Sequence, residues 1–199
     1  IMLAKERFYK YRSMKRKIFI IVLFFFIFSN NLSANTKSKI IENINNIESL
    51  KFNFTQLSLD SEESGLCFLK RPHFLKCSYN DKKQKNIIIN KKTLVILHKR
   101  YDKSYFYPVS KSYFVEILDK KKFINLVQLG KLRLDQNEIE LIFYTEKKGE
   151  IIFYFDKVKF DLLGWRVRDI NNNSTNFRIS NLVKNEEFDQ KIFSIPSIN

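Results

Sequence analysis

The sequence predicts a mainly β fold with some helix: a large, curved antiparallel sheet that one helix precedes and further helices interrupt. Short runs of bulky apolar residues, separated by polar turns, recur from residue 50 onward. The 199 residues include 20 Phe and 9 Tyr, and runs such as LIFYT (141–145) carry bulky apolar groups on both faces. A sheet with one face in water would alternate more cleanly. We therefore expect the sheet to wrap an apolar interior, although an ordinary filled core would have the same composition.

A helix opens this part of the chain, and strands follow it. Ile40, Ile41, Ile44 and Ile47 recur at helical spacing, with polar residues between them. The expected strands are LKFNFTQLSL (50–59), GLCFLK (65–70), FLKCSY (74–79), NIIIN (86–90), TLVILH (93–98), SYFYPV (104–109), EIELIFYT (138–145), EIIFYF (150–155), KVKF (157–160), GWRVRDI (164–170) and NFRISNLV (176–183).

Residues 111–129 break the rhythm of the strands. Their apolar residues suit one or two short amphipathic helices, whose apolar sides must be buried against the sheet. The residues on the expected apolar sides are Phe114, Ile117, Leu118, Phe123, Ile124 and Val127.

Residues 14–34 have the layout of a secretory signal peptide. A basic Lys-Arg-Lys stretch precedes eleven uninterrupted apolar residues, 18–28, and a small-residue exit ends at Ala34. A membrane-spanning helix is the alternative, but a helix of this length rises only about 16 Å, against a hydrocarbon core of about 30 Å. We therefore expect cleavage after Ala34, a single mature domain over 35–199, and an upstream extension over 1–13 that reflects a gene start placed too early.

The net charge of +15 invites a nucleic-acid interpretation. An exported protein meets little nucleic acid, and the lysines are scattered in short runs at turns, where they keep edge strands from pairing. We therefore expect no nucleic-acid partner, while an affinity for anionic lipid or acidic partners stays open. The sequence contains no nucleophile elbow, zinc-protease helix motif or Gly-rich phosphate loop. A binding protein without catalytic residues or cofactors is the expectation.

The two cysteines leave two interpretations open. Cys67 and Cys77 are equidistant from Pro72, so a hairpin centred there would let them face each other as a disulfide. Two free buried thiols are the alternative. His73 and His98 do not complete a metal-ligand pattern with them, so no metal site is expected.

A set of motifs in a fixed order resembles the LolA family, periplasmic carriers of outer-membrane lipoproteins, over about residues 37–196. Each motif is weak alone, and the order and spacing carry the resemblance. The motifs are Phe54-Thr55-Gln56, Gly65 with Lys70-Arg71-Pro72, Tyr79, the strand–turn–strand run ending in Tyr101-Asp102, Phe155-Asp156, Asp169, Asn181, Asn185 and Phe193-x-x-Pro196.

The resemblance implies an incomplete β-barrel, a strongly curved antiparallel sheet covered by the N-terminal helix and the inserted lid helices. It also implies a periplasmic chaperone of a Gram-negative bacterium. Such a carrier takes acylated lipoproteins from an inner-membrane ABC-type release complex and delivers them to a LolB-like outer-membrane receptor. We expect it to act as a monomer.

Residue roles follow from the same resemblance. Arg71 is implied to hydrogen-bond backbone carbonyls of the lid helices and so to latch the empty cavity, and Pro72 would fix its turn; a surface arginine in a β-turn is the alternative. The sequence departs from the family where Leu75 and Cys77 stand in place of aromatic residues. The expected cavity lining, which a one-residue shift of strand phase would invert, is Phe52, Phe54, Phe68, Leu75, Leu94 and Ile96.

Two other functions fit the same residues. One is an envelope module of the same fold that senses lipoproteins or carries another lipid. The other is a structural β protein of the envelope that binds no lipid and has a dry, filled core.

Overall fold

The structure is a computed structural model that describes residues 34–59, 61–112, 114–145 and 149–195. The chain divides into two compact units, residues 1–39 and 40–199. The first contributes only the start of a helix that covers residues 34–45. The predicted upstream extension and signal peptide, except for Ala34, lie outside the described residues. Every contact discussed below belongs to the second unit.

The second unit is built on one antiparallel sheet, which contains eleven strands in the part of the chain that the structure describes. The strands are β1 (Ser49–Ser58), β2 (Ser61–Lys70), β3 (Phe74–Tyr79), β4 (Lys85–Asn90), β5 (Thr93–His98), β6 (Lys103–Pro108), β7 (Lys131–Leu134), β8 (Glu138–Thr145), β9 (Gly149–Asp156), β10 (Leu162–Arg168) and β11 (Ser174–Lys184).

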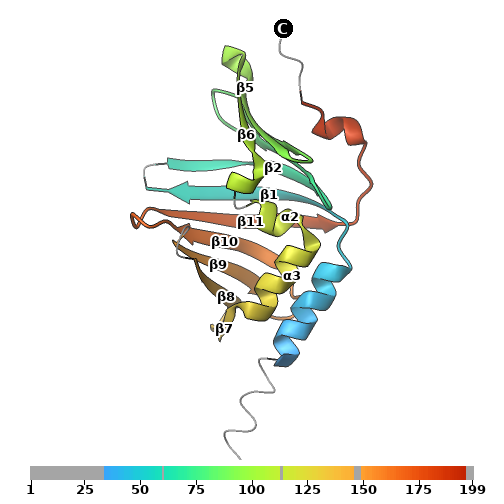
Figure 1. Cartoon of the computed structure of the whole chain (residues 1–199), viewed down its shortest axis with the longest axis vertical. Coiled ribbons are helices and arrows are strands. Elements are labelled where there is room, and N and C mark those ends of the chain that lie inside the picture. The colour runs from blue at the N-terminus through green and yellow to red at the C-terminus, as the bar shows by residue number, and fades with distance from the viewer. Residues whose placement is uncertain (1–33, 60, 113, 146–148, 196–199) are drawn as a thin grey trace, which may run out of the picture. The chain divides into compact units, whose positions relative to one another are not determined.

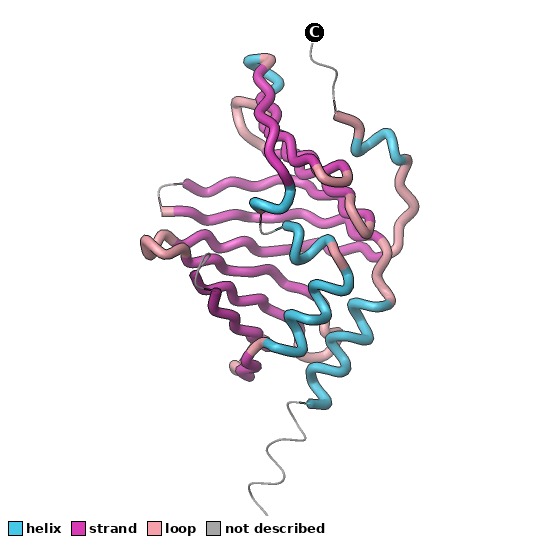
Figure 2. The backbone as a smooth tube through the Cα atoms, in the orientation of Figure 1, coloured by secondary structure: helices cyan, strands magenta, loops and turns pink. Residues whose placement is uncertain are grey.

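The strand order explains where the inserted helices must lie. The order is β6-β5-β4-β3-β2-β1-β11-β10-β9-β8-β7, an open sheet in which β6 and β7 are the two edges. The chain leaves β6 and enters β7, so the connection crosses from one edge to the other. This connection holds α2 (Phe114–Leu118) and α3 (Lys120–Leu129), which pass in front of the sheet in Figures 1 and 2. We call α2 and α3 the cover helices and the face beneath them the inner face.

Burial of apolar side chains fixes the cover helices on the inner face. Ile117 and Leu118 of α2 and Phe123 and Val127 of α3 are buried in one cluster with inner-face strand residues. Asp119 lies between the two helices, and its side chain accepts a hydrogen bond from the backbone N–H of Lys122 (3.1 Å), a standard N-cap. The segment therefore forms two separately started helices, one of the two arrangements that the spacing allows.

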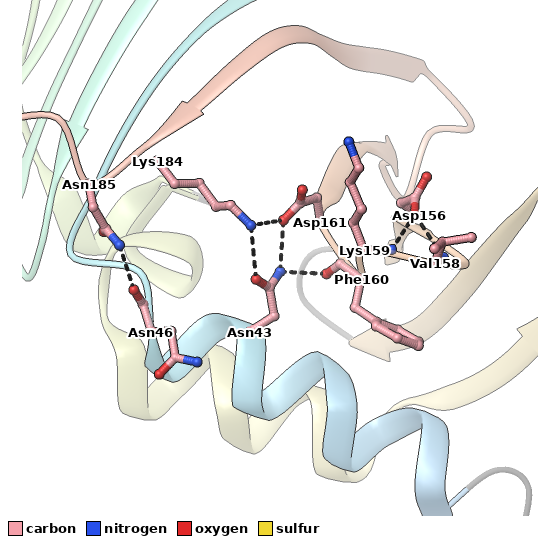
Figure 3. Close-up of polar contacts among 9 residues, drawn as sticks. All are labelled: Asn43, Asn46, Asp156, Val158, Lys159, Phe160, Asp161, Lys184 and Asn185. Carbon is pink, nitrogen blue, oxygen red and sulfur yellow. Dashed lines mark hydrogen bonds and ion pairs between the residues drawn. The ribbon is translucent and has the colours of Figure 1, made fainter.

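The helix ending at residue 45 adds Ile40 and Ile44 to the same cluster. Figure 3 shows how its polar side is tied to the sheet: Asn43 Nδ2 donates to the Phe160 carbonyl (2.8 Å) and to Asp161 Oδ1 (3.0 Å). Lys184 Nζ, at the end of β11, reaches the same Asp161 oxygen at 2.8 Å. These polar contacts join the helix, the β9–β10 turn and the end of β11.

Asn185, one of the motif residues, has a structural role. Its Nδ2 donates to the Asn46 carbonyl (2.9 Å), and its Oδ1 accepts from the Glu48 backbone N–H (2.9 Å). Its φ of 60° is in the left-handed region that Asn tolerates well. Asn185 thereby fixes the path of the chain from the N-terminal helix into β1.

On the outer face of the β2–β5 half, the segment that follows β11 packs against β2 and β3. Phe188 packs on Phe68 (ring centroids 5.3 Å apart) and Phe193, in the short helix η3 (Gln190–Phe193), packs on Phe74 (5.6 Å). Phe193 is fully buried. Both faces of this half therefore carry apolar groups, which explains the weak alternation in its sequence.

The predicted mainly β fold with a curved, open antiparallel sheet is confirmed, with two local differences. Residues 157–160, expected as a strand, form a turn, because the Asp156 carboxylate accepts the backbone N–H groups of Val158 and Lys159. Strand β7 was not expected, because four residues with two basic side chains give little periodic signal. No helix within the described ranges is long and apolar enough to span a bilayer.

Candidate functional site

The candidate site is the apolar interior between the inner face and the cover helices. Its residues come from both halves of the sheet, so the sheet must bend for them to meet. The buried cluster includes Leu50, Phe52, Phe54, Leu69, Leu75, Ile89 and Leu94 from β1–β5, Ile139, Leu141, Phe153, Phe155, Trp165 and Phe177 from β8–β11, and Ile117, Leu118, Phe123 and Val127 from the cover helices. Such a surface can hold apolar ligands by the hydrophobic effect alone.

Three stacked aromatic rings form the centre of the inner face. Phe177 of β11 stacks on Phe54 of β1 (centroids 4.8 Å, 13° between planes) and on Trp165 of β10 (4.1 Å, 9°). Gly65 on β2 makes room for this stack, since a Cβ added there would lie 2.8 Å from the Phe54 ring and 2.1 Å from the Ser78 carbonyl oxygen. The motif glycine is therefore required by close packing.

Two cavities lie in the part of the interior that the structure describes. Beneath α2 a cavity of about 10 Å³ remains, beside Ile117 and Leu118. A second cavity of about 200 Å³ opens beside it, lined by Gln56, Ser112, Ile117, Trp165, Val167, Thr175 and Phe177. Drug-sized ligands occupy pockets of roughly 300–1,000 Å³. Neither of these two cavities reaches that size. We call this arrangement, in which α2 and α3 cover the interior, the closed state; in these two cavities a ligand with several long acyl chains would fit only if α2 and α3 moved.

Polar contacts hold the start of α3 to the chain that enters β1. Lys120 Nζ donates to the Asn45 carbonyl (3.0 Å) and forms an ion pair with Glu48 (2.6 Å). The hydrogen bond from Lys120 holds the pKa of Glu48 below its ordinary value. Glu48 is largely exposed, so this pair contributes modestly to stability.

Arg71, the predicted latch, lies near this junction. Its side chain is buried, with 8% of the residue exposed. Burial lowers its pKa to about 10, although the nearby negative charges of Glu48 and Asp119 act in the opposite direction. Its backbone N–H donates to the Glu48 carbonyl (2.9 Å), and its bond to Pro72 is a cis peptide.

The hydrogen bonds that the resemblance implies for this guanidinium are not made by its Nε and Nη1 atoms. Both are buried, and neither has a partner in the described part of the chain. The Glu48 carboxylate is occupied by Lys120 instead. The Arg71 guanidinium therefore lies in the electrostatic field of Glu48 and Asp119, and these two donors make no bonds to helix carbonyls. Its role as a latch stays a prediction.

A polar cluster lies at the edge of the larger cavity. Tyr79 Oη donates to Gln56 Oε1 (3.3 Å), and Gln56 Nε2 donates to Glu63 Oε2 (3.2 Å). Lys85 forms an ion pair with Glu63 and lies 3.8 Å from the centre of the Tyr79 ring. Burial, with the nearby Glu63 charge, raises the pKa of Tyr79 above its ordinary value. Gln56 and Tyr79 of the motif set thus lie together, and Gln56 lines the larger cavity.

The two cysteines form a disulfide in the interior. Cys67 on β2 and Cys77 on β3 are directly paired across the two strands, and their sulfurs are 2.02 Å apart. Both side chains are buried and belong to the apolar cluster. The bond therefore joins β2 and β3 on the inner face.

Of the expected cavity lining, Phe52, Phe54, Leu75 and Leu94 lie in the interior and Ile96 packs against it while partly buried. Phe68 does not. Its ring lies on the outer face against Phe188, with Lys51 Nζ 5.9 Å from its centre. The reason is strand phase: Cys67 and Leu69 point inward on β2, so Phe68 between them points outward.

Of the expected apolar residues on the cover helices, Ile117, Leu118, Phe123 and Val127 are buried in the interior, and Ile124 packs against it. The side chain of Phe114 lies outside the described residues. Phe123 makes the main aromatic contacts of α3, with its ring 5.2 Å from Phe153 and 6.2 Å from Phe155.

The second half of the sheet supplies interior residues that sequence reasoning did not single out. Trp165, Phe177 and Phe153 are all buried there. On β9 bulky residues occupy the five successive positions 151–155, so alternation does not separate its two faces. The signal that could have found Trp165 is its position next to Gly164, whose φ of 145° and register shift mark a β-bulge.

Among the described residues, no group of three or more His, Cys, Asp or Glu side chains is placed to hold a metal ion. What the interior offers a ligand is apolar area, with a few polar groups at its entrance.

Comparison with known proteins assigns the family. The family model described as "Outer membrane lipoprotein carrier protein LolA" matches residues 45–196. The chain belongs to the LolA family. Membership in this family implies a periplasmic location and suggests lipid or lipoprotein binding. No curated protein matches the sequence.

Solved structures share the LolA fold at low sequence identity. An uncharacterised conserved protein from Thermus thermophilus has a TM-score of 0.54 at 10% identity, over 82% of this chain and 94% of that chain. MucB has a TM-score of 0.51 at 10% identity, over 83% of this chain and 63% of that chain. A LolA superfamily protein from Nitrosomonas europaea has a TM-score of 0.44 at 10% identity, over 79% and 97%. These similarities concern the fold alone.

Proposed function

We propose that this protein is a periplasmic carrier that binds the acyl chains of lipoproteins released from the inner membrane and delivers them to an outer-membrane receptor. The observation that carries the proposal is the apolar interior closed by two helices that join opposite edges of the sheet. Family membership supports the same role.

The energetics of acyl chains require such a container. Each buried methylene contributes roughly 0.8 kcal/mol, so a lipoprotein anchor with dozens of methylenes does not leave a membrane for water unaided. The chains would enter beneath α2 and α3 once these helices move outward. The aromatic inner face, with Phe54, Trp165 and Phe177, would then contact them.

The closed empty state limits how tightly cargo is held. Opening exposes Phe123 and Val127 and separates Lys120 from Glu48, and these costs reduce the apparent affinity for cargo. Transfer without an energy source needs a receptor that binds the same chains more tightly. A carrier with a costly open state suits that requirement.

The partners in this proposal are an inner-membrane ABC-type lipoprotein-release complex as donor and a LolB-like outer-membrane receptor as acceptor. The carrier acts as a monomer and performs no chemical step. Arg71 adjusts the cost of opening through its buried charge at the start of α3.

The test is release of acylated cargo. Membranes that contain the release complex and a labelled lipoprotein are incubated with the protein and ATP, and soluble carrier–cargo complex is isolated. We expect soluble cargo with the natural protein, and altered release or handover with Arg71→Leu. Lys70→Leu, a change of the neighbouring cation, serves as the matched control and should behave as the natural protein does.

Two results would count against the proposal. If no acylated protein leaves the membrane, the carrier role fails, and a structural envelope protein becomes the better description. If free lipids co-purify with the protein but lipoprotein is never released, an envelope lipid-binding module of the same fold is the better description.

A further inference from the structure

Two turns meet at the far end of the β5–β6 hairpin. One joins β3 to β4 (residues 80–84), and the other, which contains the short helix η1 (Lys99–Tyr101), joins β5 to β6. The backbone N–H of Arg100 donates to the Lys83 carbonyl (3.4 Å), and Arg100 Nη1 donates to the Lys82 carbonyl (3.4 Å). Figures 1 and 2 show η1 at the end of this hairpin, pointing away from α2 and α3. We call residues 80–84 and 99–103 the basic tip.

The positive charge of the basic tip is not neutralised. Its exposed cations are Lys82, Lys83, Lys99, Arg100 and Lys103. None of these five forms an ion pair with another residue in the described ranges.

The acidic residues of the tip and the neighbouring Lys76 also indicate an excess of positive charge. Its only acidic residues are Asp81 and Asp102, so its five cations exceed its carboxylates by three. The pKa of Lys76, on the adjacent β3, is lowered by burial and further by the charge of Lys99. Like charges are therefore close together here, which is unfavourable unless an anionic partner is present.

Exposed aromatic side chains accompany this charge. Tyr101, in the middle of the tip, is 54% exposed. Tyr105, Phe106 and Tyr107 continue along β6 and are 44–46% exposed. Tyr side chains favour the boundary between lipid headgroups and hydrocarbon, where the ring is buried and the hydroxyl stays hydrated.

We propose that the basic tip docks the protein on an anionic phospholipid surface, with its Lys and Arg side chains on lipid phosphates and Tyr101 at the headgroup boundary. A bilayer fits this feature better than a folded protein partner does, because the cations lie on the ends of two projecting turns. Headgroups can rearrange around such a convex surface, whereas an acidic protein would need a matching hollow. Each Lys or Arg near an anionic bilayer strengthens binding about fivefold.

The assay is flotation of the protein with lipoprotein-free vesicles. The protein is recovered from the periplasmic fraction of expressing cells, and its N-terminus is determined by mass spectrometry. One set of vesicles is pure phosphatidylcholine and the other is one-third phosphatidylglycerol, each at low and at physiological salt. Because no lipoprotein is present, the result does not depend on the carrier function.

Two triple variants each remove three positive charges. The tip variant is Lys99→Gln/Arg100→Gln/Lys103→Gln. The control variant is Lys121→Gln/Lys131→Gln/Lys159→Gln, which removes three exposed cations from α3, β7 and the β9–β10 turn.

We expect the natural protein to bind the anionic vesicles at least about tenfold more strongly than the neutral ones, and less strongly at higher salt. The tip variant should lose at least about tenfold of this binding, and the control variant no more than about twofold. Lys82→Gln/Lys83→Gln, in the other turn, should also weaken binding.

Three results would overturn the proposal. Absence of binding to anionic vesicles at low salt excludes the lipid surface as partner. Equal losses in the tip and control variants mean that net charge, and not this tip, is responsible. A tip variant that binds vesicles normally but no longer receives cargo from the release complex would identify the tip as a protein-binding surface instead.

Discussion

Removing one aromatic ring from the cover helices should show whether these helices can open while the rest of the fold stays intact. Phe123 on α3 is 2% exposed, and its ring contacts those of Phe153 and Phe155 at 5.2 and 6.2 Å. Burial of a Phe side chain is worth about 1.5–3 kcal/mol, and each aromatic pair adds about 0.5–1.5 kcal/mol. Phe123→Ala should therefore cost about 3–5 kcal/mol of the closed state.

Opening of α2 and α3 should need less free energy than unfolding of the whole domain, so the lost stability first increases opening. If α2 and α3 move while the sheet stays folded, losing about 3 kcal/mol of closed-state stability raises the open population about 100-fold. Amide exchange in α3 should accelerate by a similar factor, while exchange in β1 and β11 stays slow. Affinity for a single-chain fluorescent fatty-acyl probe should rise at least about tenfold, because less free energy is needed to open the site.

Phe193→Ala is the matched control. Phe193 is fully buried, like Phe123, but it packs on Phe74 on the outer face. This variant should lower the midpoint of urea unfolding by a comparable amount without changing probe affinity. Equal gains in probe affinity in both variants, or unchanged α3 exchange in Phe123→Ala, would refute the idea that α2 and α3 are the moving element.

Three further predictions concern the sheet and its junction with α3. Gly65→Ala should destabilise the fold by at least about 2 kcal/mol in urea denaturation followed by tryptophan fluorescence, because the added Cβ would lie 2.1 Å from a carbonyl oxygen of the next strand; a change below about 0.5 kcal/mol would contradict the packing argument. Replacing Cys67 and Cys77 together by Ala should cost about 2–3 kcal/mol, since the disulfide closes a short loop; equal stability of the reduced and oxidised natural protein would contradict this. The Lys120 hydrogen bond lowers the pKa of Glu48, so its contribution is present above the ordinary value of about 4.5 and is lost as the pH falls below it. Exchange in α3, corrected for intrinsic rates, should therefore rise at acid pH in the natural protein and respond less in Glu48→Gln.

The sequence predicts the parts of the fold in which one signal dominates. Phe52 and Phe54 alternate with polar residues on β1, and both lie on the inner face as expected. Residues 111–129 repeat apolar groups at helical spacing, and α2 and α3 bury Ile117 and Phe123. In these segments the apolar residues follow a single repeat and fall on one side of the element, so the pattern also predicts which side is buried.

Where two signals compete, the prediction fails for a physical reason. Phe68 is the bulkiest residue of β2 and was expected inside, but the strand is apolar on both faces and Phe188 offers its ring a contact outside. The directly paired cysteines place residues 67, 69, 75 and 77 on one face and residue 68 on the other, so Phe68 and Leu75 cannot both line the interior. A hairpin interpreted from its cysteines first would have shown that Phe68 and Leu75 lie on opposite faces.

The state of the interior depends on distances that no local pattern contains. Trp165 and Phe177 are directly paired on β10 and β11, and Phe54 lies on β1, the next strand, so the register of three neighbouring strands sets this stack. The pairing of β1 with β11 joins residues over a hundred positions apart, which no local pattern predicts. The same holds for the buried Arg71, whose neighbours Glu48 and Asp119 come from separate elements. Closed packing is therefore a property of the assembled fold.

The connection between β6 and β7 has a kinetic consequence. Both ends of the α2–α3 segment continue into edge strands of one sheet, so both ends of the segment stay fixed to the sheet. It can swing outward but cannot drift away, and the entropy of closing so short a tethered segment is small. Reclosing should therefore be fast once a ligand departs, which shortens the time for which the aromatic surface is in contact with water and could adhere to other proteins. In the proposed carrier the same tether should limit how far α2 and α3 move outward, so the chain between Pro108 and Lys131 should limit the size of ligand that fits.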